Sequence, residues 1–282
     1  MKLHNPNADF FVPDGLEPGA AIARTTHICV AAHQDDIEIM AYHGASECFG
    51  RSDRWFTGVV ITNGAGSPRS GLYGKYTDEE MQKVRLIEQR KAAYVGEYSC
   101  QLQLGYSSSA VKDPANVPLR EDLTAIFRAA KPEVVYLHNL ADKHDTHVGV
   151  AVRAIGVMRA LRDEYRPKKV YGCEVWRGLD WMPDEDKQAL PVSAQPNIGA
   201  ALVSVFDSQV TGGKRYDLAT AGRRLANATY LASHATDVET ALTYAMDLTP
   251  LIDDPKLSPI GYVMGFLEKT KADIENRIAK LG

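Results

Sequence analysis

Short apolar runs alternate with helical patterns along most of this chain, and this alternation limits the folds that it can adopt. Runs with the length of buried strands lie at about 26–32, 55–62, 101–106, 134–138 and 169–176. Helices are predicted between them, at about 37–49, 77–94, 119–130 and 146–164. Such alternation is typical of a mainly parallel sheet with helices on both faces, so we predict an α/β fold.

The two ends of the chain have a less regular pattern. Residues 1–25 contain scattered prolines and glycines, and we predict an irregular N-terminal arm there. Residues 26–282 are predicted to form a single domain, because 45% hydrophobic residues suffice for one large core. Beyond residue 176 we expect a further strand at 200–206 and helices at 217–232, 237–246 and 261–281.

Composition excludes several functional classes. The net charge of −4 gives no basic surface for nucleic acid or an anionic membrane. No stretch reaches the roughly 20 apolar residues that span a bilayer, and the N-terminus lacks a signal-peptide pattern. The four cysteines are far apart in sequence, which favours buried thiols. A cytoplasmic protein without nucleic-acid or membrane partners is therefore expected, and homo-oligomerisation stays open.

Ionisable side chains follow directly after the first predicted strand. His33, Asp35 and Asp36 stand at its end, just before the predicted helix 37–49. Functional sites in open α/β sheets form at the carboxyl ends of strands, and histidine and aspartate are common metal ligands. A histidine at a strand end and an aspartate pair that caps a helix also occur without a metal, so this segment alone decides nothing.

A second group follows the predicted strand 134–138. His144 and His147 are three residues apart near the start of a helix, which places them close together. His33, Asp36 and one of these two histidines would give the three ligands of a catalytic zinc. Asp35 would then be placed to accept a proton, and His144 to stabilise an oxyanion or protonate a leaving group.

Other candidates carry weaker signals. His43, His138 and His234 are expected to be packing or surface residues. The glycine-rich segment 63–71 lacks the GxGxxG pattern, and no P-loop pattern occurs, so a nucleotide cofactor is not predicted.

The chain also resembles a known family. His33-Gln34-Asp35-Asp36 after a strand, with His144-x-x-His147 later, is similar to the motifs of the PIG-L/LmbE-like deacetylases. Supporting similarity lies in segment 62–66, in Arg85-x-x-Glu88 and in segment 247–251. That family removes N-acetyl groups from amino sugars, using zinc on a Rossmann-like fold. The resemblance therefore implies an LmbE-like domain that holds Zn²⁺, with Fe²⁺ as the alternative metal.

The resemblance also implies roles for particular residues. His33, Asp36 and His147 would bind the metal, Asp35 would be the general base, and His144 the general acid or oxyanion partner. An arginine that reaches the sugar hydroxyls is typical of the family, and Arg69 and Arg85 are both candidates. The chain has Thr146 where the family has an aspartate, and Asp145 or Asp142 could take its place. Asp142 is also a further substrate-site candidate.

The expected function is thus a zinc-dependent deacetylase that acts on a small N-acetylated amino sugar or its conjugate. An amidase acting on a thiol or another acyl conjugate is the first alternative. A metal-containing binding protein without turnover and a structural zinc protein are the others. Tyr73, Trp176 and Trp181 could stack on a sugar ring or pack in the core.

Overall fold

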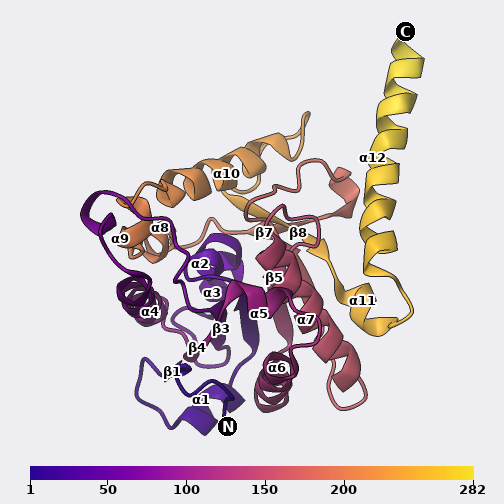
Figure 1. Cartoon of the computed structure of the whole chain (residues 1–282). Helices are drawn as coiled ribbons and strands as arrows, with labels where there is room; N and C mark the ends of the chain where they lie inside the picture. Colours follow the sequence, from indigo (N-terminus) through magenta and orange to yellow (C-terminus); the bar gives the residue numbers. More distant parts are fainter.

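The computed structural model describes residues 1–282, and one eight-stranded sheet runs through it (Figure 1). The strand order is β1-β4-β3-β2-β5-β6-β8-β7. The strands are β1 (Asp9–Phe11), β2 (His27–Ala31), β3 (Phe56–Thr62), β4 (Cys100–Tyr106), β5 (Val134–His138), β6 (Lys169–Cys173), β7 (Lys187–Pro191) and β8 (Leu242–Asp247).

The strand order reverses at the centre of the sheet. From β2 the chain moves outward through β3 to β4, and then returns to the other side of β2 to form β5 and β6. These five strands are parallel, whereas β1, β7 and β8 pair antiparallel at the edges. Open α/β sheets bind their ligands at such a reversal, which here lies between β2 and β5.

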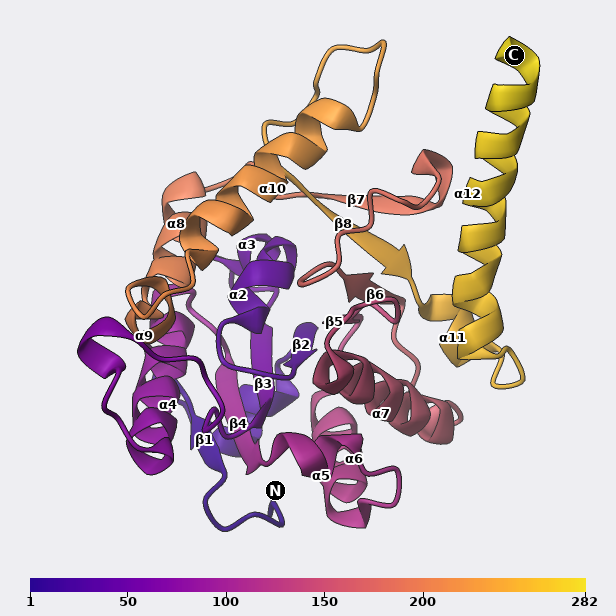
Figure 2. The ribbon, with the colours of Figure 1, turned by 45° about the horizontal axis from the view of Figure 1, so that its top comes forward.

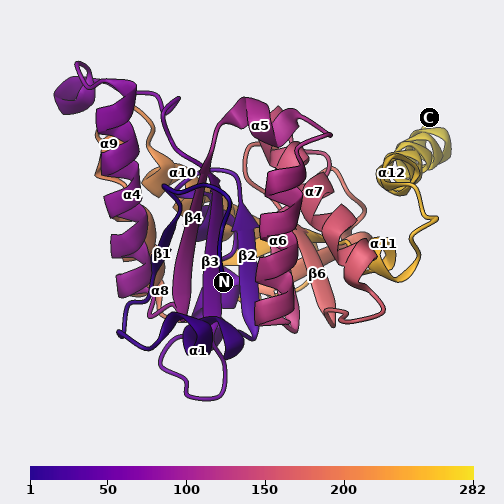
Figure 3. The ribbon, with the colours of Figure 1, turned by 60° about the horizontal axis from the view of Figure 1, so that its bottom comes forward.

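Helices cover both faces of this sheet, and Figure 3 shows α4 on one side with α6 and α7 on the other. One face carries α1 (Pro18–Ala23), α5 (Ser108–Lys112), α6 (Val117–Ala130), α7 (Asp145–Leu161) and α11 (Thr249–Asp253). The other face carries α2 (Asp36–Met40), α3 (Tyr42–Cys48), α4 (Asp78–Val95) and α8 (Pro196–Ser204). The remaining helices are α9 (Asp207–Val210), α10 (Tyr216–Tyr230) and α12 (Pro259–Leu281).

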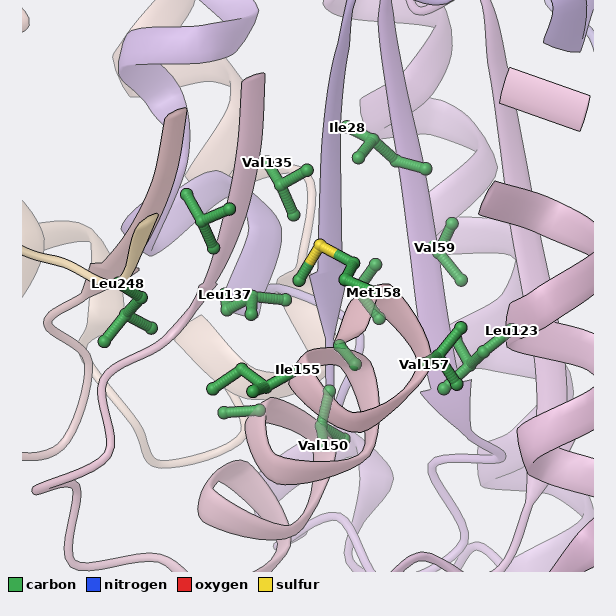
Figure 4. Packing of buried hydrophobic residues seen from close by; sticks show 14 of the residues in the cluster. Ile28, Val59, Leu123, Val135, Leu137, Val150, Ile155, Val157, Met158 and Leu248 are labelled. Atoms are coloured by element: carbon green, nitrogen blue, oxygen red, sulfur yellow. The ribbon is translucent and has the colours of Figure 1, made fainter. Parts of the chain in front are cut away.

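The central strands are buried on both faces. In β2, Ile28 and Val30 enter a core cluster that includes α6 and α7, and Figure 4 shows its packing around Ile28 and Met158. Cys29 and Ala31 point the other way, into a second cluster under α2, α3 and α8. This period-two alternation gives a strand that is apolar throughout, as expected for a parallel strand between two helical layers.

The α/β fold predicted from the sequence is confirmed, and so are most of its elements. Thr77 and Glu80 form the reciprocal hydrogen bonds of a capping box at the start of α4. The predicted helix 37–49 is divided into α2 and α3 at Ala41. The four cysteines are buried free thiols, as predicted. None of the helices is long and apolar enough to cross a membrane.

Three element predictions were wrong. The segment 200–206 is not a strand, because Pro196 opens helix α8 and the apolar run forms its buried side. The segment 237–246 is not a helix, since β8 begins at Leu242 and adds to the sheet beside β6. Short apolar runs fit either element, and periodicity alone does not separate them. The N-terminal arm is also not wholly irregular, because it contains β1 and α1.

Candidate metal centre

The reversal point of the sheet positions the predicted site. His33 and Asp36 follow β2, and Asp36 opens helix α2. His147 lies in the first turn of α7, which follows β5, and His144 stands just before that helix. Figure 2 shows α2 and α7 on either side of β2 and β5. Two segments more than a hundred residues apart therefore meet at one edge of the sheet.

Three potential ligand atoms form a small triangle there. Nδ1 of His33 lies 3.1 Å from Oδ2 of Asp36 and 3.2 Å from Nε2 of His147. The third side, from Nε2 of His147 to Oδ2 of Asp36, measures 3.3 Å. Ligands at zinc-bond lengths in a tetrahedral arrangement are separated by about 3.3 Å. The donor set and its spacing therefore fit a divalent metal.

The charges around this triangle favour a cation. Burial disfavours ionisation of Asp36, but His147 and His138 outweigh it and hold the Asp36 pKa well below its usual value. Burial likewise opposes protonation of His147, yet Asp36 and Asp142 together raise its pKa to about 9. The pocket thus stabilises a positive charge at His147, which a proton or a metal ion can provide.

Asp142 supports the second segment from behind. Its Oδ2 lies 3.5 Å from Nδ1 of His147, on the side of the ring away from Asp36. It accepts hydrogen bonds from the backbone N–H of His144 at 3.0 Å and of Trp176 at 3.1 Å. A carboxylate behind a metal-binding histidine fixes the ring orientation. Asp142 therefore lies in the supporting shell of the site, and it does not line the pocket.

His138, which was predicted to be a packing or surface residue, packs at the same place. Its side chain is fully buried at the end of β5, and its ring stacks on that of His147 with centroids 3.8 Å apart. Its Nε2 accepts the N–H of Ala32 at 2.9 Å, so this nitrogen is already engaged. His138 thus packs the site against β2. His138 is the last residue of β5, which pairs with β2, and this position at a strand end is the sequence signal that could have placed it at the site.

Asp35 is held in an unusual conformation beside the triangle. Its φ of 86° lies in the left-handed region, which non-glycine residues seldom adopt outside functional sites. Its carboxylate accepts a hydrogen bond from Arg85 at 2.7 Å. Burial raises the pKa of Asp35 to about 6, although the Arg85 guanidinium opposes this shift. The chain therefore places a buried carboxylate of raised pKa next to the ligand atoms.

The two candidate arginines occupy different positions. Arg85 is 1% exposed, lines the pocket and pairs with both Asp35 and Glu88. Arg69 does not line the pocket, because its guanidinium binds Asp78 and the backbone oxygens of Ala65 and Tyr76. Arg85 therefore belongs to the site, whereas Arg69 stabilises the loop that precedes α4.

Part of the chain is similar to a known protein family. Residues 28–158 match the family model PIG-L, described as GlcNAc-PI de-N-acetylase. This segment is similar to the PIG-L family. It contains every residue of the triangle, together with Asp35, Arg85, Asp142 and His144. No curated protein sequence matches the chain.

Solved structures share the fold over most of the chain at low sequence identity. N,N'-diacetylchitobiose deacetylase from Pyrococcus horikoshii is 14% identical with a TM-score of 0.63, over 82% of this chain and 86% of its own. A conserved protein from Thermus thermophilus is 18% identical with a TM-score of 0.60, over 83% and 99%. A 4-carboxy-2-hydroxymuconate hydratase from Pseudomonas putida is 16% identical with a TM-score of 0.59, over 79% and 95%.

A cavity of about 320 Å³ opens above the centre, and part of its wall lies outside the PIG-L segment. The loop after β3 contributes Asn63 and Gly64. Gly64 has a φ of +74°, and a Cβ there would lie 3.0 Å from Arg85 side-chain carbons, so glycine permits this close approach. The loop after β3 therefore packs directly against the buried side chain of Arg85.

The far wall comes from Trp176, one of the predicted stacking residues, and from a later segment that the sequence did not identify as pocket-forming. Trp176, Lys214 and Tyr216 line the cavity, and the Lys214 ammonium lies 5.1 Å from the Trp176 ring centroid. Tyr73 and Trp181 do not line it. The Tyr73 hydroxyl donates to Asp207, and Trp181 lies beside α12, so Trp176 is the predicted stacking residue that faces the pocket.

Proposed function

We propose that this protein is a metal-dependent hydrolase that removes the N-acetyl group from a small amino sugar or amino-sugar conjugate. The triangle of His33, Asp36 and His147 carries the proposal, because its spacing fits a bound divalent metal. The PIG-L match covers these residues, and one structural neighbour is named as a diacetylchitobiose deacetylase. Zn²⁺ is the proposed metal and Fe²⁺ the alternative.

The residues around the triangle have complementary roles in this proposal. A bound divalent metal would supply Lewis acidity and lower the pKa of water toward about 7. Asp35 would accept the proton of the attacking water, and Arg85 would orient its carboxylate. His144, whose ring meets the His33 ring edge-on at 5.0 Å, would donate to the oxyanion or to the leaving amine nitrogen. The amide C–N bond breaks, and acetate and a free amine leave.

The wall of the cavity favours a sugar-sized substrate. Trp176 presents a ring beside Tyr216, at 6.1 Å between centroids, and a flat aromatic surface suits the apolar face of a sugar. Asn63, Ser67 and Ser108 add polar groups that can bind hydroxyls. We propose that the sugar ring lies against Trp176 with its acetamido group toward His33.

The fold alone does not separate this function from others, because another neighbour is a hydratase. The deciding assay measures acetate release from N-acetylglucosamine and several of its conjugates, with the purified protein reconstituted with Zn²⁺ or Fe²⁺. We expect release that a chelator abolishes and added metal restores. Trp176→Ala is expected to raise KM about tenfold or more with a smaller effect on kcat, since stacking contributes to binding.

Metal-loaded protein that releases no acetate from any conjugate would contradict the proposal. In that case, release of another acyl group would favour the amidase alternative. Metal binding without any turnover would favour a binding protein.

A further inference from the structure

A second cavity lies between helices α8 and α10, apart from the candidate metal centre. Its volume is about 180 Å³, and none of its lining residues lines the cavity at the metal centre. Figure 2 shows the two helices side by side. An apolar cavity of about 150 Å³ is large enough to bind benzene. The cavity between α8 and α10 can therefore hold a small organic molecule.

Most of the wall of this second cavity is apolar. Val203 of α8 and Ala221 and Leu225 of α10 contribute apolar side chains to it. Tyr42 of α3 also lines the cavity, and its hydroxyl already donates to the Gln195 carbonyl at 2.6 Å. A ligand in this cavity would therefore bind largely through an apolar part.

Arg224 is the one cationic side chain in this wall. It is 9% exposed, and its guanidinium carbon lies 4.9 Å from the centroid of the Tyr42 ring. Its Nη2 donates to the carbonyls of Glu38 at 2.7 Å and Ile39 at 3.2 Å, whereas its Nε has no partner. Burial lowers the pKa of Arg224 to about 10, so the guanidinium stays charged at neutral pH. The cavity therefore contains a buried positive charge with a free donor.

No carboxylate of the chain neutralises this charge. Arg85, the other buried arginine, pairs with both Asp35 and Glu88. Arg224 forms no ion pair, and no carboxylate contributes to the shift of its pKa. A buried arginine without a paired anion is rare, because burying an unpaired charge is costly. The contrast with Arg85 indicates that an anion from outside the chain pairs with Arg224.

We propose that the second cavity binds a monocarboxylate with a short apolar tail, whose carboxylate pairs with Arg224 and whose tail lies between α8 and α10. One guanidinium balances one negative charge, whereas a phosphate group carries nearly two. Guanidinium N–H groups also match the geometry of a carboxylate. Asp217, the carboxylate in the wall, accepts hydrogen bonds from Arg215 at 2.9 and 2.7 Å, so its charge is already paired. This binding is independent of the proposed deacetylase reaction.

Titration calorimetry with hexanoate tests the proposal, because hexanoate joins one carboxylate to a short apolar chain. We expect one hexanoate to bind per chain, with a Kd of about 1 mM or below. Hexanol has the same tail without the charge, and acetate has the charge without the tail. Each should bind about tenfold more weakly or less, since each lacks one of the two interactions.

Two variants place the binding in this cavity. Arg224→Gln removes the charge but keeps an amide donor for the Glu38 carbonyl, and it should weaken hexanoate binding about tenfold or more. Its control is Arg277→Gln, the same change at an exposed position on α12. Ala221→Phe keeps Arg224 and fills the cavity instead, so it tests the site even where the loss of Arg224 affects folding. It should abolish binding.

Two further variants complete the test. Ala219→Phe makes the same change as Ala221→Phe at an exposed position of α10 outside the cavity, and it should bind hexanoate like the native chain. His33→Ala should also bind it like the native chain, which separates this cavity from a carboxylate bound at the metal centre. The proposal would be overturned by a native chain that does not bind hexanoate at about 10 mM. Binding that persists in Ala221→Phe, or hexanol that binds as tightly as hexanoate, would overturn it as well.

Discussion

Replacing Asp35 by asparagine is expected to lower kcat for deacetylation by about 10²–10⁴-fold, the usual contribution of a general base. Asparagine keeps the shape of the side chain but cannot accept a proton from water. Since Asp35 is not a corner of the ligand triangle, the variant should bind as much metal as the native protein. Acetate release and metal content, measured on the same preparations, test both parts of this prediction.

The control is Asp145→Asn, which makes the same chemical change at an exposed carboxylate next to His144. Its activity should stay close to that of the native protein. If Asp35→Asn retained full activity with bound metal, another group would have to be the base. If it lost the metal instead, Asp35 would belong to the ligand set.

Arg85→Ala is expected to destabilise the fold by about 3–5 kcal/mol, the typical cost of removing one partner from a buried ion pair. The guanidinium is the charge partner of both Asp35 and Glu88, and these carboxylates are themselves almost fully buried. Without Arg85, both must either lose their charge or stay unpaired in a medium of low dielectric constant. Urea unfolding of the native and variant chains measures the difference.

Arg69→Ala provides the comparison for this prediction. Its guanidinium pairs with Asp78, whose side chain is 65% exposed, so the loss should be about 1 kcal/mol. Equal destabilisation by the two variants would contradict the distinction drawn between the arginines. Because Arg69 lies outside the pocket, Arg69→Ala should also keep a deacetylase activity close to that of the native protein.

The centre of the site was largely predictable from the sequence because its residues follow clear strands. The run before His33 is apolar throughout, and the run before His144 has the same character, so both had to be inner strands of one sheet. Ligands at the ends of adjacent parallel strands then meet. His33, Asp36 and His147 do so in the structure, at mutual distances of 3.1–3.3 Å.

The remainder depends on contacts that no local pattern encodes. His138 is a strand residue by sequence, and only the pairing of β5 with β2 brings it against His147. The choice between Arg69 and Arg85 required knowing which side chain is covered by the loop after β3. The pocket wall at Lys214 and Tyr216 was missed because it follows α8, whose apolar run fits a buried strand equally well.

The central claim is that His33, Asp36 and His147 hold one divalent metal. Titrating Zn²⁺ into protein from which a chelator has removed all metal tests this claim most directly. We predict that one Zn²⁺ binds per chain in the native protein and in His234→Ala, an exposed histidine that serves as the control. His33→Ala, whose side chain is a partly exposed corner of the triangle, should remain folded by circular dichroism and lose this binding. A native chain that binds no metal, or a His33→Ala variant that binds it with native affinity, would contradict the account.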